Sequence, residues 1–168
     1  MLLVTFACGV GPAQAAFPGA YAPMTVEPHI VDGVHTFDLR SAQARARREK
    51  KSLYVYLGAH NCPYCRKYEA FLAAHQSALV AHFAKDYIVV DLRGDLRATD
   101  KRVMIRTESL NLPYTAFQTA IGDERTRVLT YPTVWLLTPD AKPLMQMPSG
   151  AGTFETVPEQ LEILRLVN

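Results

Sequence analysis

Short apolar runs divide the chain, and they have the length and residue types of buried β-strands. The first, LYVYL over 53–57, lies between Lys51-Ser52 and Gly58 and is rich in aromatic and branched residues, which is typical of a strand inside a sheet. A turn-forming stretch, TPDAK, follows a later run, so the apolar residues after it predict a hairpin partner. The predicted strands span 53–57, 87–92, 133–137 and 144–147.

Helical spacing separates these runs. Residues 39–51 are good helix formers, and Cys65, Tyr68 and Leu72 share one face of a helix whose apolar side continues beyond His75. Pro158 suits the first turn of a last helix. The stretch 94–128 is polar and mixed, and its apolar positions predict one helical piece, so we expect a helical insertion there. Those positions are Leu110, Leu112, Phe117 and Ile121.

The order of these elements predicts an α/β fold. Strand, helix and strand, followed by a hairpin and a terminal helix, indicate a central mixed sheet flanked by helices on both faces. We expect this domain to span 37–168. Residues 17–36 contain prolines and glycines and are expected to form an extended leader without a core of its own, with an early strand over 29–35 that Gly33 disfavours.

Composition agrees with one globular domain. The chain has 168 residues, of which 49% are hydrophobic and 20% charged, as in proteins that bury a core of ordinary size. A net charge of +2 is too small to indicate a nucleic-acid partner. Basic residues are nevertheless dense between Arg40 and Lys51, which predicts a solvated helix face or, alternatively, a docking patch for an acidic partner.

Residues 1–16 are expected to form a secretory signal peptide. A short apolar run precedes Ala13-Gln14-Ala15, an A-x-A cleavage site, although no basic residue stands before the run. The run is too short to span a bilayer, which needs about 20 apolar residues, and Cys8 has a poor lipidation context because Phe6 is bulky. We therefore expect a periplasmic or secreted protein with no membrane span in the mature chain.

Cleavage would remove Cys8 and leave only Cys62 and Cys65, an even number that suits an oxidising compartment. Pro63 fits the first helical position, so Cys62 is expected at the N-cap, where its sulfur accepts hydrogen bonds from the backbone N–H groups of Tyr64 and Cys65. The helix dipole also favours a thiolate there. The thiolate is the form that attacks disulfides, and we expect the Cys62 sulfur to be exposed and Cys65 to lie behind it.

Other interpretations of the cysteine pair remain open. A zinc site would need four ligands, and a set of two cysteines with His60 and His75 has no second cysteine pair to complete it. The alternative function, from another class, is a metal-handling or binding module that keeps the fold and uses only Cys62 and Cys65 as thiolate ligands. A c-type haem would require histidine where Arg66 stands. A purely structural disulfide would close too short a loop to stabilise the fold much.

At this point the sequence resembles the thioredoxin superfamily. The resemblance rests on LYVYLGA leading into Cys62-Pro63-Tyr64-Cys65, then YIVVDL, then Tyr131-Pro132-Thr133 opening the strand TVWLL, and it covers roughly residues 37–167. It implies that Cys62 attacks, that Cys65 resolves the mixed disulfide, and that Pro132 is cis and lines the substrate groove with Tyr131 and Thr133.

The sequence departs from thioredoxin near the cysteines. Tyr56 stands where thioredoxin has a buried acid, Asn61 replaces the tryptophan before the first cysteine, and Pro63-Tyr64 is the dipeptide typical of glutaredoxins. His60, Pro63 and Tyr64 are therefore candidates for tuning the thiolate, and the alternative for His60 is a partly exposed loop histidine. The chain is most similar to periplasmic thiol:disulfide interchange proteins of the SoxW type.

This resemblance implies a protein disulfide oxidoreductase with no organic cofactor and no metal. Its partners would be protein thiols or disulfides and a redox partner protein, and we expect a monomer that acts as a reductase or isomerase rather than as a strong oxidant.

Overall fold

The computed structural model describes residues 16–123, 128–145 and 155–165. The helical elements are η1 (Gly19–Tyr21), α1 (Arg40–Glu49), α2 (Pro63–Ala74), α3 (Gln76–Asp86), η2 (Asp100–Arg102), α4 (Tyr114–Ile121) and α5 (Val157–Arg165), where η marks a 3-10 helix. The strands are β1 (Met24–Val26), β2 (His29–Val31), β3 (Val34–Asp38), β4 (Ser52–Ala59), β5 (Tyr87–Gly94), β6 (Val103–Arg106), β7 (Asn111–Pro113), β8 (Thr133–Leu137) and β9 (Pro143–Met145).

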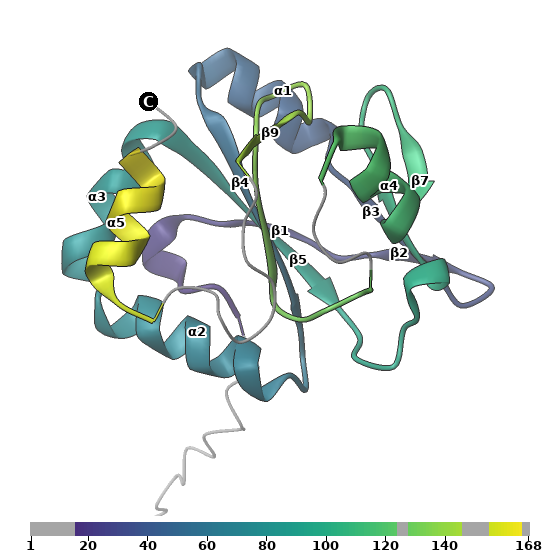
Figure 1. Ribbon diagram of the computed structural model, residues 1–168, viewed down its shortest axis with the longest axis horizontal. Helices are drawn as coiled ribbons and strands as arrows, with labels where there is room; N and C mark the ends of the chain where they lie inside the picture. The colour runs from purple at the N-terminus through teal and green to yellow at the C-terminus, as the bar shows by residue number, and fades with distance from the viewer. Residues whose placement is uncertain (1–15, 124–127, 146–154, 166–168) are drawn as a thin grey trace, which may run out of the picture.

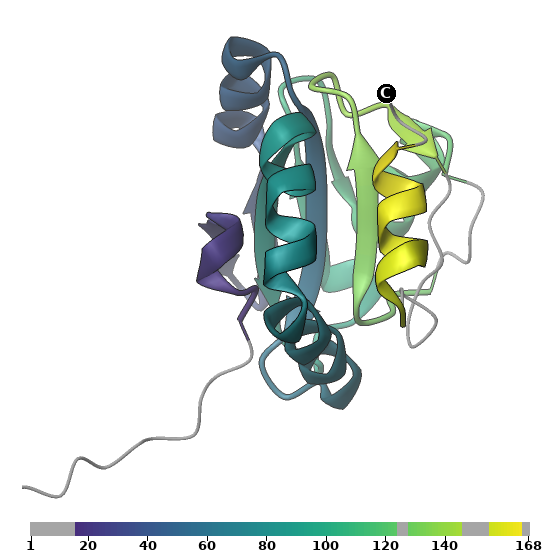
Figure 2. The same cartoon turned by 90° about the vertical axis from the view of Figure 1, so that its left-hand side faces the viewer.

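A five-stranded mixed sheet forms the centre of the fold, in the order β1-β5-β4-β8-β9. Strand β4 pairs parallel with β5 and antiparallel with β8, so Val55 faces Val90 on one side and Trp135 on the other. Helices α1 and α4 lie on one face of this sheet, and α2, α3 and α5 lie on the opposite face (Figures 1 and 2). The α/β fold class with helices on both faces is thus confirmed, and β4, β5 and β8 contain the predicted strands at 53–57, 87–92 and 133–137.

Alternation along the central strands divides the core between the two faces. Tyr54 points to the α2–α3 side, where its ring lies 4.7 Å from that of Phe83. Trp135 points to the other side, and its ring lies 5.7 Å from Phe117 and 5.8 Å from Tyr114, both on α4. All five side chains are buried, so each face has its own aromatic cluster.

The segment 17–36 is part of the folded domain, which corrects the expectation of a leader without a core. Phe17 and Tyr21 are buried among the aromatic rings on the α2–α3 side. Strand β1 pairs with β5 at the edge of the central sheet, and β2 and β3 form a hairpin. Asp32 and Gly33 both have positive φ, at 50° and 74°, so Gly33 makes the hairpin turn rather than disfavouring strands.

Tyr21→Phe tests whether this segment stabilises the domain. The Tyr21 hydroxyl donates a 2.8 Å hydrogen bond to the Leu72 carbonyl in a buried position, and losing such a bond costs about 1 kcal/mol. We expect the free energy of unfolding to fall by about that amount, measured by urea denaturation. The matched control is Ala20→Ser at the neighbouring exposed position, which should change little; equal stability of both variants would contradict the integration of this segment.

The stretch 94–128 contains strands as well as a helix, so the prediction of a helical insertion is right only for α4. Strand β6 pairs parallel with β3 and antiparallel with β7, which makes a second sheet in the order β2-β3-β6-β7. Both strands have four residues or fewer, too short for periodicity to indicate them clearly. Because α4 supplies Tyr114 and Phe117 to the core, this insertion is part of the core rather than an addition at its edge.

Several arginines of the basic helix α1 have acidic partners within the chain. Arg47 contacts Glu108 at 2.6 Å and Asp140 at 2.8 Å, and Arg45 contacts Glu49 at 2.7 Å. These exposed ion pairs add little stability individually, but they hold α1 against the loops before β7 and after β8. The helix is therefore a solvated face whose positive charge is in part neutralised by the same chain.

Strand β9 confirms the predicted hairpin partner as far as Met145, while Met147 lies outside the described residues. No helix in the described part of the chain is long and apolar enough to cross a membrane.

Candidate active site

Cys62 and Cys65 form a disulfide where β4 leads into α2. Cys62 is the N-cap of α2, Pro63 occupies the first turn, and the Cys65 backbone N–H donates to the Cys62 sulfur at 3.0 Å. The prediction of a capping sulfur is therefore confirmed. Helix α2 begins here because Pro63 needs no N–H partner and Cys62 satisfies one of the donors that a helix start leaves unpaired.

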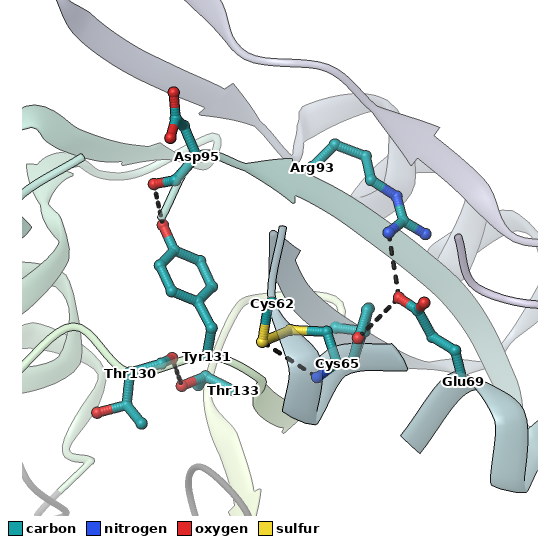
Figure 3. The surroundings of a disulfide bond; sticks show 9 residues. Cys62, Cys65, Glu69, Arg93, Asp95, Thr130, Tyr131 and Thr133 are labelled. Atoms are coloured by element: carbon teal, nitrogen blue, oxygen red, sulfur yellow. Dashed lines mark hydrogen bonds and ion pairs between the residues drawn. A yellow bond between two sulfur atoms is a disulfide. The ribbon is translucent and has the colours of Figure 1, made fainter. Parts of the chain in front are cut away.

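Both sulfurs are enclosed, so the expectation of an exposed Cys62 is wrong. Cys62 is 1% exposed and Cys65 is fully buried, whereas Tyr64 between them is 57% exposed. Tyr131 precedes β8 and Thr133 begins it, and Figure 3 draws both on the Cys62 side of the disulfide. Local sequence spacing does not reveal this enclosure of the sulfurs.

The Tyr131–Pro132 bond is cis, as the sequence predicted. Thr133 pairs with Leu57, which places Pro132 at the same end of the sheet as the cysteines. The Thr133 hydroxyl donates to the Thr130 carbonyl at 2.7 Å, and the Tyr131 hydroxyl donates to the Asp95 carbonyl at 3.4 Å. These bonds tie the proline turn to β8 and to the loop after β5 (Figure 3).

Gly94 gives the Tyr131 ring its space. A Cβ at position 94 would lie 2.8 Å from the Tyr131 hydroxyl oxygen, closer than van der Waals contact allows. The last residue of β5 therefore has to be glycine for Tyr131 to cross it and reach the Asp95 carbonyl.

The residues predicted to tune the thiolate lie in different places. Pro63 and Tyr64 are exposed at the start of α2. His60 is also exposed, and it lines a pocket of about 160 Å³ together with residues of β1 and β5. His75 lies at the junction of α2 and α3, with its ring 4.9 Å from that of Phe71.

These histidines and the cysteines do not form a common site in the structure. Among the residues that the structure describes, no group of three or more His, Cys, Asp or Glu side chains is placed to hold a metal ion. The geometry therefore gives the zinc interpretation no support.

A buried charged cluster lies behind the disulfide. Glu69 follows Cys65 by one turn of α2, and its carboxylate accepts hydrogen bonds from the Tyr56 hydroxyl at 2.9 Å and from Arg93 at 3.2 Å. Arg93 also pairs with Asp91. None of these residues is more than 6% exposed, and Figure 3 shows Arg93 and Glu69 on the Cys65 side of the disulfide.

Burial sets the protonation of this cluster. Desolvation, followed by the neighbouring Glu69 charge, raises the pKa of Tyr56 far above its usual range, so Tyr56 stays protonated and donates. Desolvation also raises the pKa of Asp91, although Arg93 opposes that shift. An acid is thus present near the cysteines even though Tyr56 occupies the position where thioredoxin has one.

Sequence analysis missed these charged residues, but a signal was present. Asp91 and Arg93 stand two apart in the apolar strand YIVVDLRG, so they point to the same face, and two opposite charges inside a buried strand indicate a paired cluster. Glu69 lies four residues after Cys65, on the same side of α2.

Comparison with known proteins identifies the domain. A family model described as a thioredoxin-like domain matches residues 39–164. No curated protein and no solved structure matches the chain.

Proposed function

We propose that this chain, which belongs to the thioredoxin-like domain family, is a secreted thiol:disulfide oxidoreductase that exchanges disulfides with other proteins in the periplasm. The observation that carries the proposal is the Cys62–Cys65 disulfide at the N-terminus of α2, beside the cis-proline turn. Because its motifs resemble theirs, we place its activity with that of the SoxW-type thiol:disulfide interchange proteins.

In the reduced protein, the Cys62 thiolate would attack one sulfur of a substrate disulfide. The substrate's other sulfur leaves as a thiolate, and a mixed disulfide joins Cys62 to the substrate. The Cys65 thiolate then attacks the Cys62 sulfur, which releases the second substrate thiol and closes the Cys62–Cys65 disulfide. Two electrons pass to the substrate in total, and the reverse sequence oxidises it.

The second attack requires Cys65 to lose its proton. Glu69 is one helical turn beyond Cys65, a spacing that brings the Cβ atoms within about 6 Å, and Tyr56 and Arg93 hold its carboxylate. We infer that Glu69 supplies the buried acid near Cys65 that Tyr56 displaces from β4.

Exposed apolar side chains around the site support a protein substrate. Tyr64 is 57%, Leu96 43% and Val128 68% exposed. Tyr64 lies within the cysteine motif, Leu96 follows β5, and Val128 precedes β8. These positions meet at one end of the sheet, because β4 and β5 run parallel and β8 runs opposite. A chain bound along Tyr131–Thr133 would contact them, and contiguous exposed apolar groups are typical of interaction sites.

Equilibration with a glutathione redox buffer tests the direction of transfer. The Pro63-Tyr64 dipeptide resembles that of glutaredoxins, and position 64 lacks the histidine that adds positive charge beside the thiolate of DsbA. We therefore expect a reduction potential of about −200 to −230 mV, the glutaredoxin range. The disulfide is measured by thiol alkylation and mass spectrometry. A potential near −120 mV, as in DsbA, would make the protein an oxidant, and stoichiometric metal in freshly purified protein would favour the metal-handling alternative.

A further inference from the structure

A pocket at the edge of the central sheet opens onto the first described residue of the chain. It has a volume of about 160 Å³ and lies between residues 16–17, β1, the loop after β4 and β5. Its lining residues are Ala16, Phe17, Thr25, Glu27, His60, Asp91 and Arg93. Ala16 is exposed at this pocket, while Phe17 is buried in the core.

Asp91 is the buried acid of this pocket, and one of its oxygens is unsatisfied. Its Oδ2 accepts a 3.2 Å hydrogen bond from the Phe17 backbone N–H and pairs with Arg93. Its Oδ1 is buried without a hydrogen-bond partner. A buried carboxylate oxygen without a donor costs free energy, so a cationic donor placed beside Asp91 would stabilise the folded chain.

The buried charged groups around Asp91 carry a net negative charge that one more cation would neutralise. Two buried carboxylates, Glu69 and Asp91, share the single buried guanidinium of Arg93 among the residues described in this cluster. Glu27 adds a third acid at the rim, and His60 lies opposite on the loop after β4. An ammonium group beside Asp91 would balance the two buried carboxylates.

The chain itself can supply that group. The A-x-A site Ala13-Gln14-Ala15 places cleavage after Ala15, one residue before the end of the predicted signal segment 1–16. The mature chain would then begin at Ala16. The Ala16 nitrogen would then be an α-ammonium roughly 3–4 Å along the backbone from the Phe17 nitrogen, which already contacts Asp91. Burial of Phe17 between Tyr21 and Tyr56 fixes this position.

We propose that the pocket formed by Asp91, Glu27 and Thr25 binds the α-ammonium group of Ala16 that processing after Ala15 creates. The ligand is thus a primary ammonium, and the uncleaved chain lacks it because a peptide bond occupies that nitrogen. The inference rests on the proposed secretion, but not on the redox activity of Cys62 and Cys65. Processing would therefore stabilise the mature fold through an ion pair that the precursor does not have.

The test compares three forms of the protein released from a cleavable fusion: one that begins at Ala16, the same chain acetylated at Ala16, and one extended by Gly-Ser. The free-amine form should have a Tm about 2–4 °C above both others, the shift expected for one charged contact in a chain of this size. Asp91→Asn should abolish the difference. Glu162→Gln, exposed on α5 outside the pocket, should preserve it.

If Asp91→Asn fails to fold, titration of the α-amine by NMR in the Ala16 form provides the second measurement. The carboxylates of Asp91 and Glu27 should raise the pKa of the amine above its usual 7.7–8.0. This effect should outweigh the opposing effect of Arg93 and His60. Since this group would have a raised pKa in the folded state, its stabilisation is complete below about pH 7.7 and is lost as the pH rises through the folded pKa.

Equal Tm values for the three forms, or an amine pKa at or below the usual range, would overturn the inference. A mass of the secreted protein that shows another first residue would also overturn it. Thiol exchange by the same samples is measured separately, so a failure of the redox proposal would be seen independently.

Discussion

Cys65→Ser is expected to accumulate mixed disulfides with protein substrates, whereas Cys62→Ser is expected to accumulate few. Cys62 caps α2, where the Cys65 N–H and the helix dipole favour its thiolate, so it attacks first. Without Cys65, nothing in the site resolves the intermediate. Both variants should reduce the rate of disulfide exchange to the uncatalysed background, and non-reducing electrophoresis followed by mass spectrometry of the captured chains measures the difference.

Asn61→Ser is the matched control, because it changes an exposed neighbour and keeps both sulfurs. It should trap no more than the unmodified protein. Alkylation of the reduced protein at mildly acidic pH provides an independent check. If Cys65 reacts before Cys62, the assignment of attacking and resolving sulfurs is wrong.

Arg93→Met is expected to lower the free energy of unfolding by about 3–5 kcal/mol, the cost of leaving a buried charge without its partner. Arg93 is 3% exposed and contacts both Glu69 and Asp91. Methionine keeps the length of the side chain but removes the charge. Urea denaturation of the oxidised protein at neutral pH measures the loss.

The pH dependence of this loss has a definite sign. The pKa of Asp91 is raised in the folded protein, so the folded state holds its proton to higher pH than the unfolded state, and the contribution of Asp91 to stability falls as the pH rises between the two pKa values. Removing Arg93 should strengthen this effect, because Arg93 opposes the shift. Arg93→Met should therefore be least destabilising in acid, where Asp91 is protonated.

Glu69→Gln combined with Arg93→Met should recover part of the lost stability, because the double variant leaves fewer unpaired charges in the core. A loss below about 1 kcal/mol for Arg93→Met alone, typical of an exposed pair, would show that the cluster is not the buried network described here.

The parts of this fold that sequence predicts best are those governed by local chemistry. Strands β4, β5 and β8 were predicted because continuous apolar runs indicate strands buried on both faces. The capping role of Cys62 followed from Pro63, whose ring and missing N–H fit only the first turn of a helix. The cis bond before Pro132 followed from the family resemblance rather than from local pattern.

The remainder depends on contacts between distant residues. Phe17 and Tyr21 stand in a segment rich in proline and glycine, and only the packed structure shows their rings inserted beside Phe83. Strands β6 and β7 form because β3 offers an edge, which no local pattern reveals. The enclosure of Cys62 similarly depends on the packed fold, in which the segment with the cis proline, about 70 residues away in the chain, lies at the same end of the sheet.

Reduction of a disulfide-bonded protein such as insulin by glutathione, followed with and without catalytic amounts of this protein, tests the central claim most directly. We predict that the unmodified protein accelerates the reduction and that the Cys62→Ser, Cys65→Ser double variant returns the rate to the uncatalysed background. If the unmodified protein, shown to be folded and fully reducible, reduces the substrate no faster than the double variant, the assignment as a thiol:disulfide oxidoreductase is contradicted.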